Sequence, residues 1–167
     1  MKKAGQGFTL IELVMLNVIL GVLAAVALPK FVSLKDNARV AALNGLAGTL
    51  QSAANIGRSR CAVTPTCNMA ASACGGTTPF YTENGQHIFT HFGWPSGWGA
   101  CWVNDGVGSI NNLVQISSDF QLVAHVPGSF AGVYQLVGSP DPTNCKVIYQ
   151  LDSSQPTLTV TVVSTGC

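Results

Sequence analysis

The cysteines are the residues of this 167-residue chain whose type and number most directly indicate chemistry. Their positions are Cys61, Cys67, Cys74, Cys101, Cys145 and Cys167. None of them forms a C-x-x-C pair, so disulfide bonds are favoured over a thiol redox centre or a zinc site. An even number of cysteines is typical of a disulfide framework in an oxidising compartment. Six cysteines allow 15 pairings, and spacing does not choose among the first four.

Two small groups of side chains are candidate metal ligands. His87 and His91 are four residues apart, but no third ligand lies near them, which disfavours zinc. Asp105, in an Asn-Asp-Gly turn, and Asp141 with Asn144 carry the oxygens that calcium prefers. Turn chemistry explains these residues equally well, so calcium stays an alternative and no cofactor is expected.

The remaining composition argues against several classes of protein. There is no serine elbow, no paired carboxylate set and no glycine-rich phosphate loop, so we predict that the chain is not an enzyme. Charged residues make up only 9% and the net charge is +1, which is not the footprint of a nucleic-acid-binding protein. Trp94, Trp98 and Trp102 are expected to pack in the interior rather than to form a carbohydrate-binding or subunit-contact patch.

One carboxylate, Glu12, lies inside an apolar run from Phe8 to Leu28. A helix over that run would be about 31 Å long, which matches a hydrocarbon core of about 30 Å. Lys2 and Lys3 place the preceding leader in the cytoplasm, so the rest of the chain is expected to be exported. A charge inside a membrane span costs roughly 2.5–3.5 kcal/mol and therefore needs a functional reason. Asn17 is a second polar residue in the run, either a hydrogen-bonding group between helices or a harmless variation.

The apolar run predicts the start of a helix of some fifty residues. Pro29 should bend or locally open it. From Ala38 a stripe of period 3.6 follows, rich in alanine and glycine, which should pack closely against a sheet. Its members are Leu43, Leu46, Ala47, Leu50, Ala53, Ala54 and Gly57. The helix is predicted to end near Gly57 to Cys61.

The second half of the sequence predicts strands and turns. A loop spans residues 61–78, an aromatic loop spans 93–99 and a short helical turn spans 109–113. Strands are predicted at 120–126, 133–137, 146–151 and 157–163, with a weaker alternation at 87–92.

The last two predicted strands also suggest one cysteine pair. Folding them back on each other brings Cys145 opposite Val163 and leaves Cys167 within reach. A bond between Cys145 and Cys167 would close a loop of about 22 residues and contribute about 3 kcal/mol.

The amino-terminal residues carry a family resemblance. The basic leader followed by Gly-Phe-Thr-Leu-Ile-Glu-Leu at 7–13 resembles the class III signal of type IV pilins and pseudopilins. Residues 29–32 and 36–39 look most like those of MSHA-type major pilins. The alternative is an ordinary secretory signal peptide with Ala-Val-Ala at 25–27, cut near Leu28. The apolar run is longer than the usual 7–15 residues or so and is interrupted by Glu12, which disfavours that alternative.

The resemblance implies how the chain is processed and divided. A prepilin peptidase would cut between Gly7 and Phe8 and methylate the new amino terminus of Phe8. Residues 1–7 would be the leader, 8–35 a hydrophobic helix that first anchors the chain and then enters a filament core, and 36–167 an exported head. Glu12 would pair with the amino group of a neighbouring subunit and set the register of the filament. The alternative is a carboxylate that snorkels to the membrane surface and has no partner.

The fold class expected from these observations is α+β, with a long amino-terminal helix packed on a carboxy-terminal antiparallel sheet. The implied function is that of a structural subunit of an MSHA-like type IV pilus, for adhesion, surface attachment or motility. Its implied partners are identical subunits, the inner membrane before assembly, prepilin peptidase and the pilus assembly machinery. The implied location is the inner membrane and then the surface of a Gram-negative bacterium. The alternatives are a minor pilin, a type II secretion pseudopilin, or a membrane-anchored secreted binding or enzymatic domain.

Overall fold

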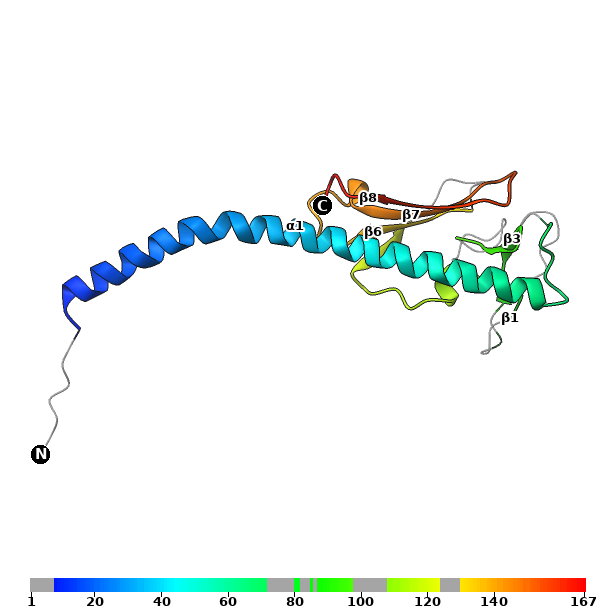
Figure 1. The fold of residues 1–167 in the computed structure, drawn as a ribbon, viewed down its shortest axis with the longest axis horizontal. Coiled ribbons are helices and arrows are strands. Elements are labelled where there is room, and N and C mark those ends of the chain that lie inside the picture. Colours follow the sequence, from blue (N-terminus) through cyan, green and yellow to red (C-terminus); the bar gives the residue numbers. More distant parts are fainter. Residues whose placement is uncertain (1–7, 72–79, 82–84, 86, 98–107, 124–129) are drawn as a thin grey trace, which may run out of the picture. The chain divides into compact units, whose positions relative to one another are not determined.

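A computed structural model describes residues 8–71, 80–81, 85, 87–97, 108–123 and 130–167. The chain divides into two compact units, residues 1–38 and 39–167. Helix α1, Leu10–Val63, has 54 residues; it begins in the first unit and ends in the second (Figure 1). The predicted α+β class, with a long amino-terminal helix and an antiparallel sheet, is confirmed.

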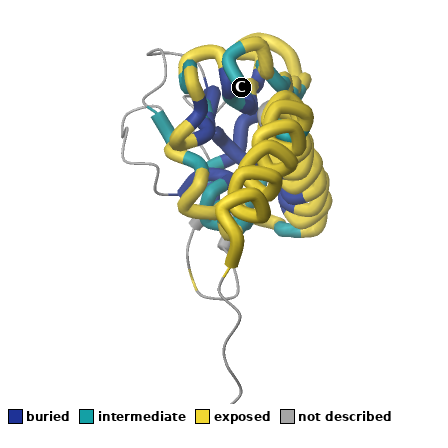
Figure 2. Tube along the Cα trace, turned by 90° about the vertical axis from the view of Figure 1, so that its left-hand side faces the viewer, coloured by how far each residue is buried: buried dark blue, intermediate teal, exposed yellow. Residues whose placement is uncertain are grey.

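The first unit is a helical segment with an exposed apolar surface. The described large apolar side chains from Phe8 to Leu34 are between 47% and 80% exposed. Figure 2 colours this part of the helix almost wholly as exposed. Among the described residues, α1 is the one helix long and apolar enough to cross a membrane, judged by length and composition. Pro29 lies inside the helix, which continues on both sides of it.

The second unit buries one face of the same helix. Leu43, Leu50 and Ala54 have no exposed surface, and Leu46 and Ala53 are 7% exposed, so the predicted stripe is confirmed. These residues belong to one core with side chains from the sheet, including Tyr134 and Tyr149. Side chains three and four positions apart share a helix face, which explains why the sequence predicted this pattern.

A four-stranded antiparallel sheet completes the second unit. Its strands are β5 (Phe120–Val123), β6 (Gly132–Leu136), β7 (Lys146–Leu151) and β8 (Leu158–Val163), in the order β5-β6-β7-β8 (Figure 1). Inward-facing residues alternate with outward-facing ones along β6 and β7, as the period of two in a strand requires. The 3-10 helices η1 (Ile110–Asn112) and η2 (Pro142–Asn144) lie in the connections.

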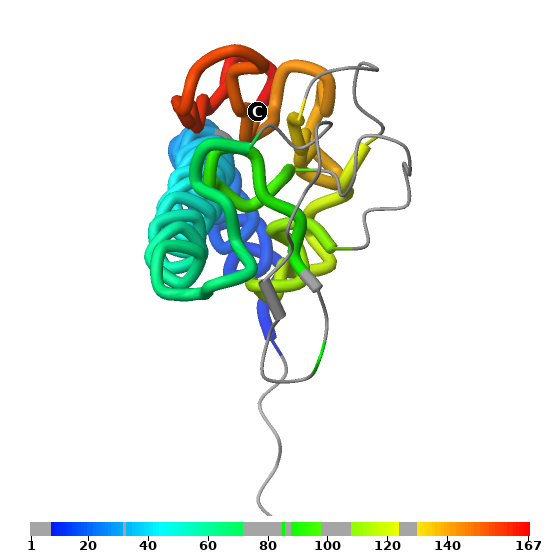
Figure 3. Tube along the Cα trace, turned by 90° about the vertical axis from the view of Figure 1, so that its right-hand side faces the viewer, coloured from blue at the N-terminus to red at the C-terminus, as the bar shows by residue number. Residues whose placement is uncertain are grey.

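Two very short sheets lie near the end of α1. One pairs β1 (Phe80–Tyr81) with β2 (His87–Ile88), and the other pairs β3 (Thr90–His91) with β4 (Trp94–Pro95). Figure 3 looks onto this end and shows the loop that follows α1 running beside the 87–97 segment. The backbone N–H of Phe92 donates to the carbonyl of Ala71 at 2.9 Å, which joins the two segments.

The structure corrects where the helix ends. It continues to Val63, past the predicted end near Gly57 to Cys61. Gly57 is not a terminator; a side chain there would collide with the ring of Pro95, so the glycine permits a close approach. Pro65 ends the helix instead, because a proline disfavours helical conformation in the residue before it.

The strand predictions were wrong in smaller ways. Strand β8 begins at Leu158 rather than Thr157, and β7 pairs Lys146, not Cys145, with Val163. The connection between them holds an extra residue in a turn, because the Asp152 carboxylate accepts from the backbone of Ser154 and Gln155. The aromatic loop at 93–99 contains the short strand β4, and Phe92 interrupts the segment before it with a positive φ of 49°. Residues 124–126 of the predicted β5 lie outside the described residues.

Candidate functional site

Glu12 takes part in a capping box at the start of α1. Its Oε2 accepts from the backbone N–H of Thr9 at 2.9 Å and from the Thr9 hydroxyl at 2.8 Å. In return, the backbone N–H of Glu12 donates to Thr9 Oγ1 at 3.4 Å. This reciprocal pattern satisfies donors that a helix start otherwise leaves open, and a carboxylate there also suits the positive end of the helix dipole. Within one chain the carboxylate therefore has a structural role, which the sequence reasoning missed although Thr-x-x-Glu is its signature.

The other predicted site residues of the first unit that the structure describes are exposed on the helix or just before it. Phe8, the predicted new amino terminus, is 78% exposed, and Asn17 is exposed on the helix. Gly7, the other side of the predicted cut, lies outside the described residues. The cut, the methylation and the kink at Pro29 stay predictions.

A disulfide joins Cys145 and Cys167, whose Cα atoms are 5.0 Å apart. It connects the residue before β7 to the segment after β8. Arg39 binds the same place from the helix: its guanidinium donates to the Cys167 carbonyl at 2.5 Å and to the Gly138 carbonyl at 3.2 Å. The helix is thus tied to the carboxy-terminal segment at the first residue of the second unit.

Sequence reasoning did not single out Arg39. The signal was its position four residues before Leu43, which places it on the buried stripe of the helix one turn earlier. A long cationic side chain at that position can lay its aliphatic stem along the helix while its guanidinium donates to backbone carbonyls.

A second disulfide joins Cys61 and Cys67, whose Cα atoms are 5.2 Å apart. Cys61 is 1% exposed and packs in a small apolar cluster with Ile88 and Met69. The bond fixes the loop after α1 to the helix end. Cys74 and Cys101 lie outside the described residues.

The two histidines are not brought together by one strand. His87 lies in β2 and His91 in β3, which belong to different sheets. His91 is 1% exposed, stacks on the ring of Phe130 with centroids 4.1 Å apart, and lies 2.7 Å from the Asp152 carbonyl through Nε2. Burial lowers the pKa of His91, although Asp152 acts in the opposite direction. Its surroundings are those of a packed core histidine.

The candidate calcium ligands that the structure describes belong to a turn. Asp141 Oδ1 accepts from the backbone N–H of Thr143 at 3.0 Å, and Oδ2 accepts from the Asn144 amide at 2.7 Å. Hydrogen bonds from the side chains of Thr143 and Asn144 lower the pKa of Asp141. Asp105 lies outside the described residues. In the described part of the chain, no group of three or more His, Cys, Asp or Glu side chains could hold a metal ion.

Buried aromatic groups link the small sheets to the core. The Tyr149 hydroxyl donates to the Pro95 carbonyl at 2.7 Å, and the Tyr134 hydroxyl donates to Asn111 Oδ1 at 2.5 Å. Burial raises the pKa of both tyrosines, so both stay protonated as donors. Trp94 is half-buried: its indole N–H donates to the Pro156 carbonyl at 3.0 Å, and the Arg58 guanidinium lies 4.3 Å above its ring.

The other tryptophans, Trp98 and Trp102, lie outside the described residues. Among the described residues, the functional features are therefore structural: an exposed apolar helix, a capped start, two disulfides and a tie at Arg39.

Comparison with known proteins gives one informative similarity. The chain is 42% identical over 74 residues to the type IV narrow pilus major component PilA5 of Thermus thermophilus. The matched part covers 44% of this chain and 64% of that protein, which is just under two thirds of its length. No family model matches the chain. No solved structure matches it.

Proposed function

We propose that this chain is a structural subunit of a type IV pilus. The observation that carries the proposal is the contrast along α1, whose first half exposes its apolar side chains while its second half buries one face in a disulfide-stapled head. Apolar helix surface of this extent is stable only in a bilayer or against other protein. A subunit that waits in the membrane and then packs its helix into a fibre meets both conditions. The similarity to a pilus major component supports the same function.

Processing is part of the proposal. The leader is removed between Gly7 and Phe8 by prepilin peptidase, Phe8 is methylated, and the assembly machinery extracts the mature chain from the inner membrane. Residues 8–35 form the hydrophobic helix and residues 36–167 the exported head. The fibre is MSHA-like and serves adhesion, surface attachment or motility on a Gram-negative cell.

Glu12 has two successive roles in this proposal. In the single chain its carboxylate closes the capping box with Thr9. In the fibre the amino group of a neighbouring Phe8 pairs with Glu12, and the pair fixes the axial register of the helices. A charge pair in a low-dielectric core costs roughly 3–5 kcal/mol to break when one partner remains.

The decisive experiment is mass spectrometry of fibres sheared from cells that naturally produce the chain. The expected spectrum shows this chain as the dominant mass, beginning at a methylated Phe8, with Cys61 bonded to Cys67 and Cys145 to Cys167. A trace amount in the fibres would indicate a minor pilin or pseudopilin instead. A mature chain that begins at Leu28 and is absent from fibres would overturn the proposal.

A further inference from the structure

An open strand edge lies along one side of the sheet in the second unit. Strand β8 is last in the order β5-β6-β7-β8, and it pairs with β7 over its whole length without a bulge (Figure 1). Its residues, Leu-Thr-Val-Thr-Val-Val at 158–163, include no charge and no proline. Sheets usually protect such an edge with a lysine, a proline, a bulge or a covering segment. Strand β8 has none of the first three protections, so its edge can accept another strand.

The register decides which backbone groups of β8 face β7. Residues directly opposite in an antiparallel pair alternate between pairs that exchange hydrogen bonds and pairs that do not. Just beyond the strand ends, the Asp152 N–H donates to the Thr157 carbonyl at 3.1 Å, so these opposite residues form a hydrogen-bonded pair. Counted from there in steps of two, the positions of β8 that bond to β7 are Thr159, Thr161 and Val163.

The other positions of β8 turn their backbone groups to the open edge. These are Leu158, Val160 and Val162. On the far side of β7, the Leu136 N–H donates to the Cys145 carbonyl at 3.0 Å, which gives the same alternation. In the part of the chain that the structure describes, no hydrogen bond reaches the N–H or the C=O of these three residues of β8. Backbone groups of this kind bond either to water or to another strand.

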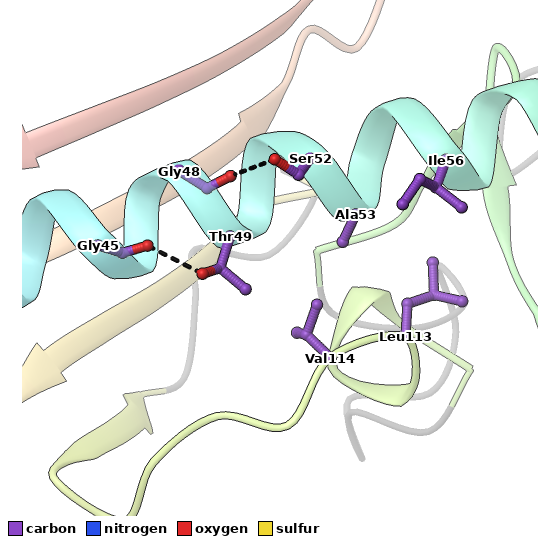
Figure 4. A pocket seen from close by; sticks show the side chains of 8 residues that line it. All are labelled: Gly45, Gly48, Thr49, Ser52, Ala53, Ile56, Leu113 and Val114. Atoms are coloured by element: carbon purple, nitrogen blue, oxygen red, sulfur yellow. Dashed lines mark hydrogen bonds between the residues drawn. The ribbon is translucent and has the colours of Figure 1, made fainter.

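The apolar groove along α1 in the same unit differs from this edge, because its polar side chains are already satisfied. The Thr49 hydroxyl donates to the Gly45 carbonyl at 2.9 Å, and the Ser52 hydroxyl donates to the Gly48 carbonyl at 2.8 Å. Both bonds run back along the helix, as the dashed lines in Figure 4 show. The groove therefore has no hydrogen-bonding pattern that selects a partner, whereas the edge of β8 does.

One antiparallel register with a second copy of β8 satisfies every open group. With Val160 opposite Val160 of the second copy, Leu158 lies opposite Val162 on either side of the centre. All of these positions have open backbone groups, so they become the hydrogen-bonded pairs of the new ladder. Any other register places at least one open position opposite a residue that is already bonded or lies outside β8.

The same register also places the exposed side chains in matching pairs. Thr159 and Thr161 are the exposed residues of β8, and Thr159 of each copy would face Thr161 of the other. Threonine pairs across antiparallel strands are favourable, and side chains approach closest at positions that do not exchange backbone hydrogen bonds. No like charges would meet, because β8 carries no charge. The edge is therefore complementary to itself in both backbone and side chains.

We infer that two copies of this chain pair through the open edges of β8, antiparallel and with Val160 at the twofold axis. The contact is isologous, since the same surface of both copies takes part, and it joins two four-stranded sheets into one. It goes beyond the proposed function, because it uses the second unit alone and requires no fibre. In the proposed fibre, where head-to-tail contacts keep all chains pointing one way, a twofold contact would join two fibres side by side.

The first test is cysteine crosslinking of the purified full-length chain in detergent micelles. Thr159→Cys chain is mixed with Thr161→Cys chain after the native disulfides have formed, and the mixture is oxidised mildly. The expected product is a dimer in which a disulfide joins the two introduced cysteines, because those positions are opposite each other in the inferred register. Each variant alone should give little dimer, since identical positions then lie diagonally across the ladder.

Two outcomes of the crosslinking would overturn the inference. One is a mixture that stays monomeric, which would leave the edge to water or to a different protein. The other is a yield from either single variant equal to that from the mixture, which would show contact without the inferred register. Because no fibre is involved, failure here leaves the proposed function standing, and failure to find fibres leaves this test intact.

The second test uses charge at the same two exposed positions. Thr159→Lys combined with Thr161→Lys places like charges opposite each other twice, so the dissociation constant of the dimer should rise about tenfold. Thr159→Lys combined with Thr161→Asp places opposite charges there and should restore the affinity of the unchanged chain. Sedimentation equilibrium in density-matched detergent measures both.

Folding of the charge variants is checked by the bond between Cys145 and Cys167 and by circular dichroism. Both substituted side chains are exposed, and lysine is a common residue at natural strand edges, so both variants should fold. An unchanged dissociation constant in the folded variant with two lysines would overturn the inference. An equal loss in the variant with lysine and aspartate would do the same, because it would show that the two positions do not face each other.

Discussion

The two halves of α1 have similar side chains and opposite surroundings. Leu20, in the first half, is 60% exposed, and Leu50, in the second half, has no exposed surface. The second half carries a stripe that a sheet of the same chain covers, whereas the large apolar side chains of the first half are covered by nothing in the described part of the chain. Leucine thus stabilises the head in one half and is available for association in the other. The comparison separates the part of the helix that stabilises the fold from the part whose apolar surface stays exposed in the single chain.

Truncating one leucine in each half of α1 should give the largest difference in stability. Leu50→Ala should lower the free energy of unfolding of the head by about 2–5 kcal/mol, because it removes buried contacts and leaves a cavity. Leu20→Ala should change it by less than about 0.5 kcal/mol, as expected for an exposed site. The measurement is chemical denaturation of the full chain in detergent, followed by tryptophan fluorescence. Equal losses from the two variants would contradict the separation.

The two disulfides should contribute different amounts to the free energy of unfolding, measured in the same way. Replacing Cys145 and Cys167 with serine opens a loop of sequence separation 22 and should cost about 3 kcal/mol. Replacing Cys61 and Cys67 opens a loop of separation 6 and should cost about 2 kcal/mol. The unfolding midpoints of the two double variants give the order. A larger loss from the shorter loop would show that native packing, not chain entropy, sets the contribution.

Arg39 tests the boundary between the halves. Arg39→Ala removes the hydrogen bonds to the Cys167 and Gly138 carbonyls. Because hydrogen bonds to charged groups contribute about 1.5–3 kcal/mol, the free energy of unfolding should fall by about that amount. Hydrogen exchange should speed up most for the backbone amides of residues 39–46, near the tie, and not for residues 50–60. Arg39→Lys should recover part of the protection. Uniform acceleration along the helix would mean that Arg39 supports the whole head rather than its edge.

The smallest effect concerns pH. Burial holds the pKa of His91 below that of an unfolded histidine, near 6.5, so the unfolded chain binds the proton first as the pH falls. Stability is therefore complete above about pH 6.5 and declines below it, with a slope of at most about 1.4 kcal/mol per pH unit for one proton. Unfolding at pH 7.5, 6.5 and 5.5 measures the slope.

His91→Phe, which keeps an aromatic ring against Phe130, should flatten that slope. The carboxylates of Asp141 and Asp152 have lowered pKa values and act only below their ordinary value of 3.8, so they do not interfere. An unchanged slope in the variant would assign the effect to another group.

Much of the fold could be predicted from the sequence because it depends on local periodicity. The stripe from Leu43 to Gly57 and the β-branched runs of β7 and β8 repeat at the spacings of a helix and a strand. Features that depend on contacts between residues far apart in the chain could not be predicted from the sequence. Gly57 makes room for Pro95, 38 residues away, and Arg39 binds a carbonyl 128 residues away. The shift of one residue between β7 and β8 depends on the side chain of Asp152 in the turn. The Thr9–Glu12 capping box has a recognisable sequence signature. It was not predicted because the apolar run around Glu12 favoured an amino group of another subunit as the partner of the carboxylate.

In the proposed fibre, the bond between Cys145 and Cys167 would have a mechanical consequence under tension. A pull along α1 reaches the head through the core and through Arg39, which binds the carbonyl of the same cysteine that closes the β7–β8 hairpin. With that end of the hairpin closed by a covalent bond, β8 cannot peel from β7 one residue at a time. The load then falls on many hydrogen bonds of the strand pair at once, and the hairpin resists as a unit. In the proposed fibre, the second unit would therefore stay folded under a load that reaches it along α1.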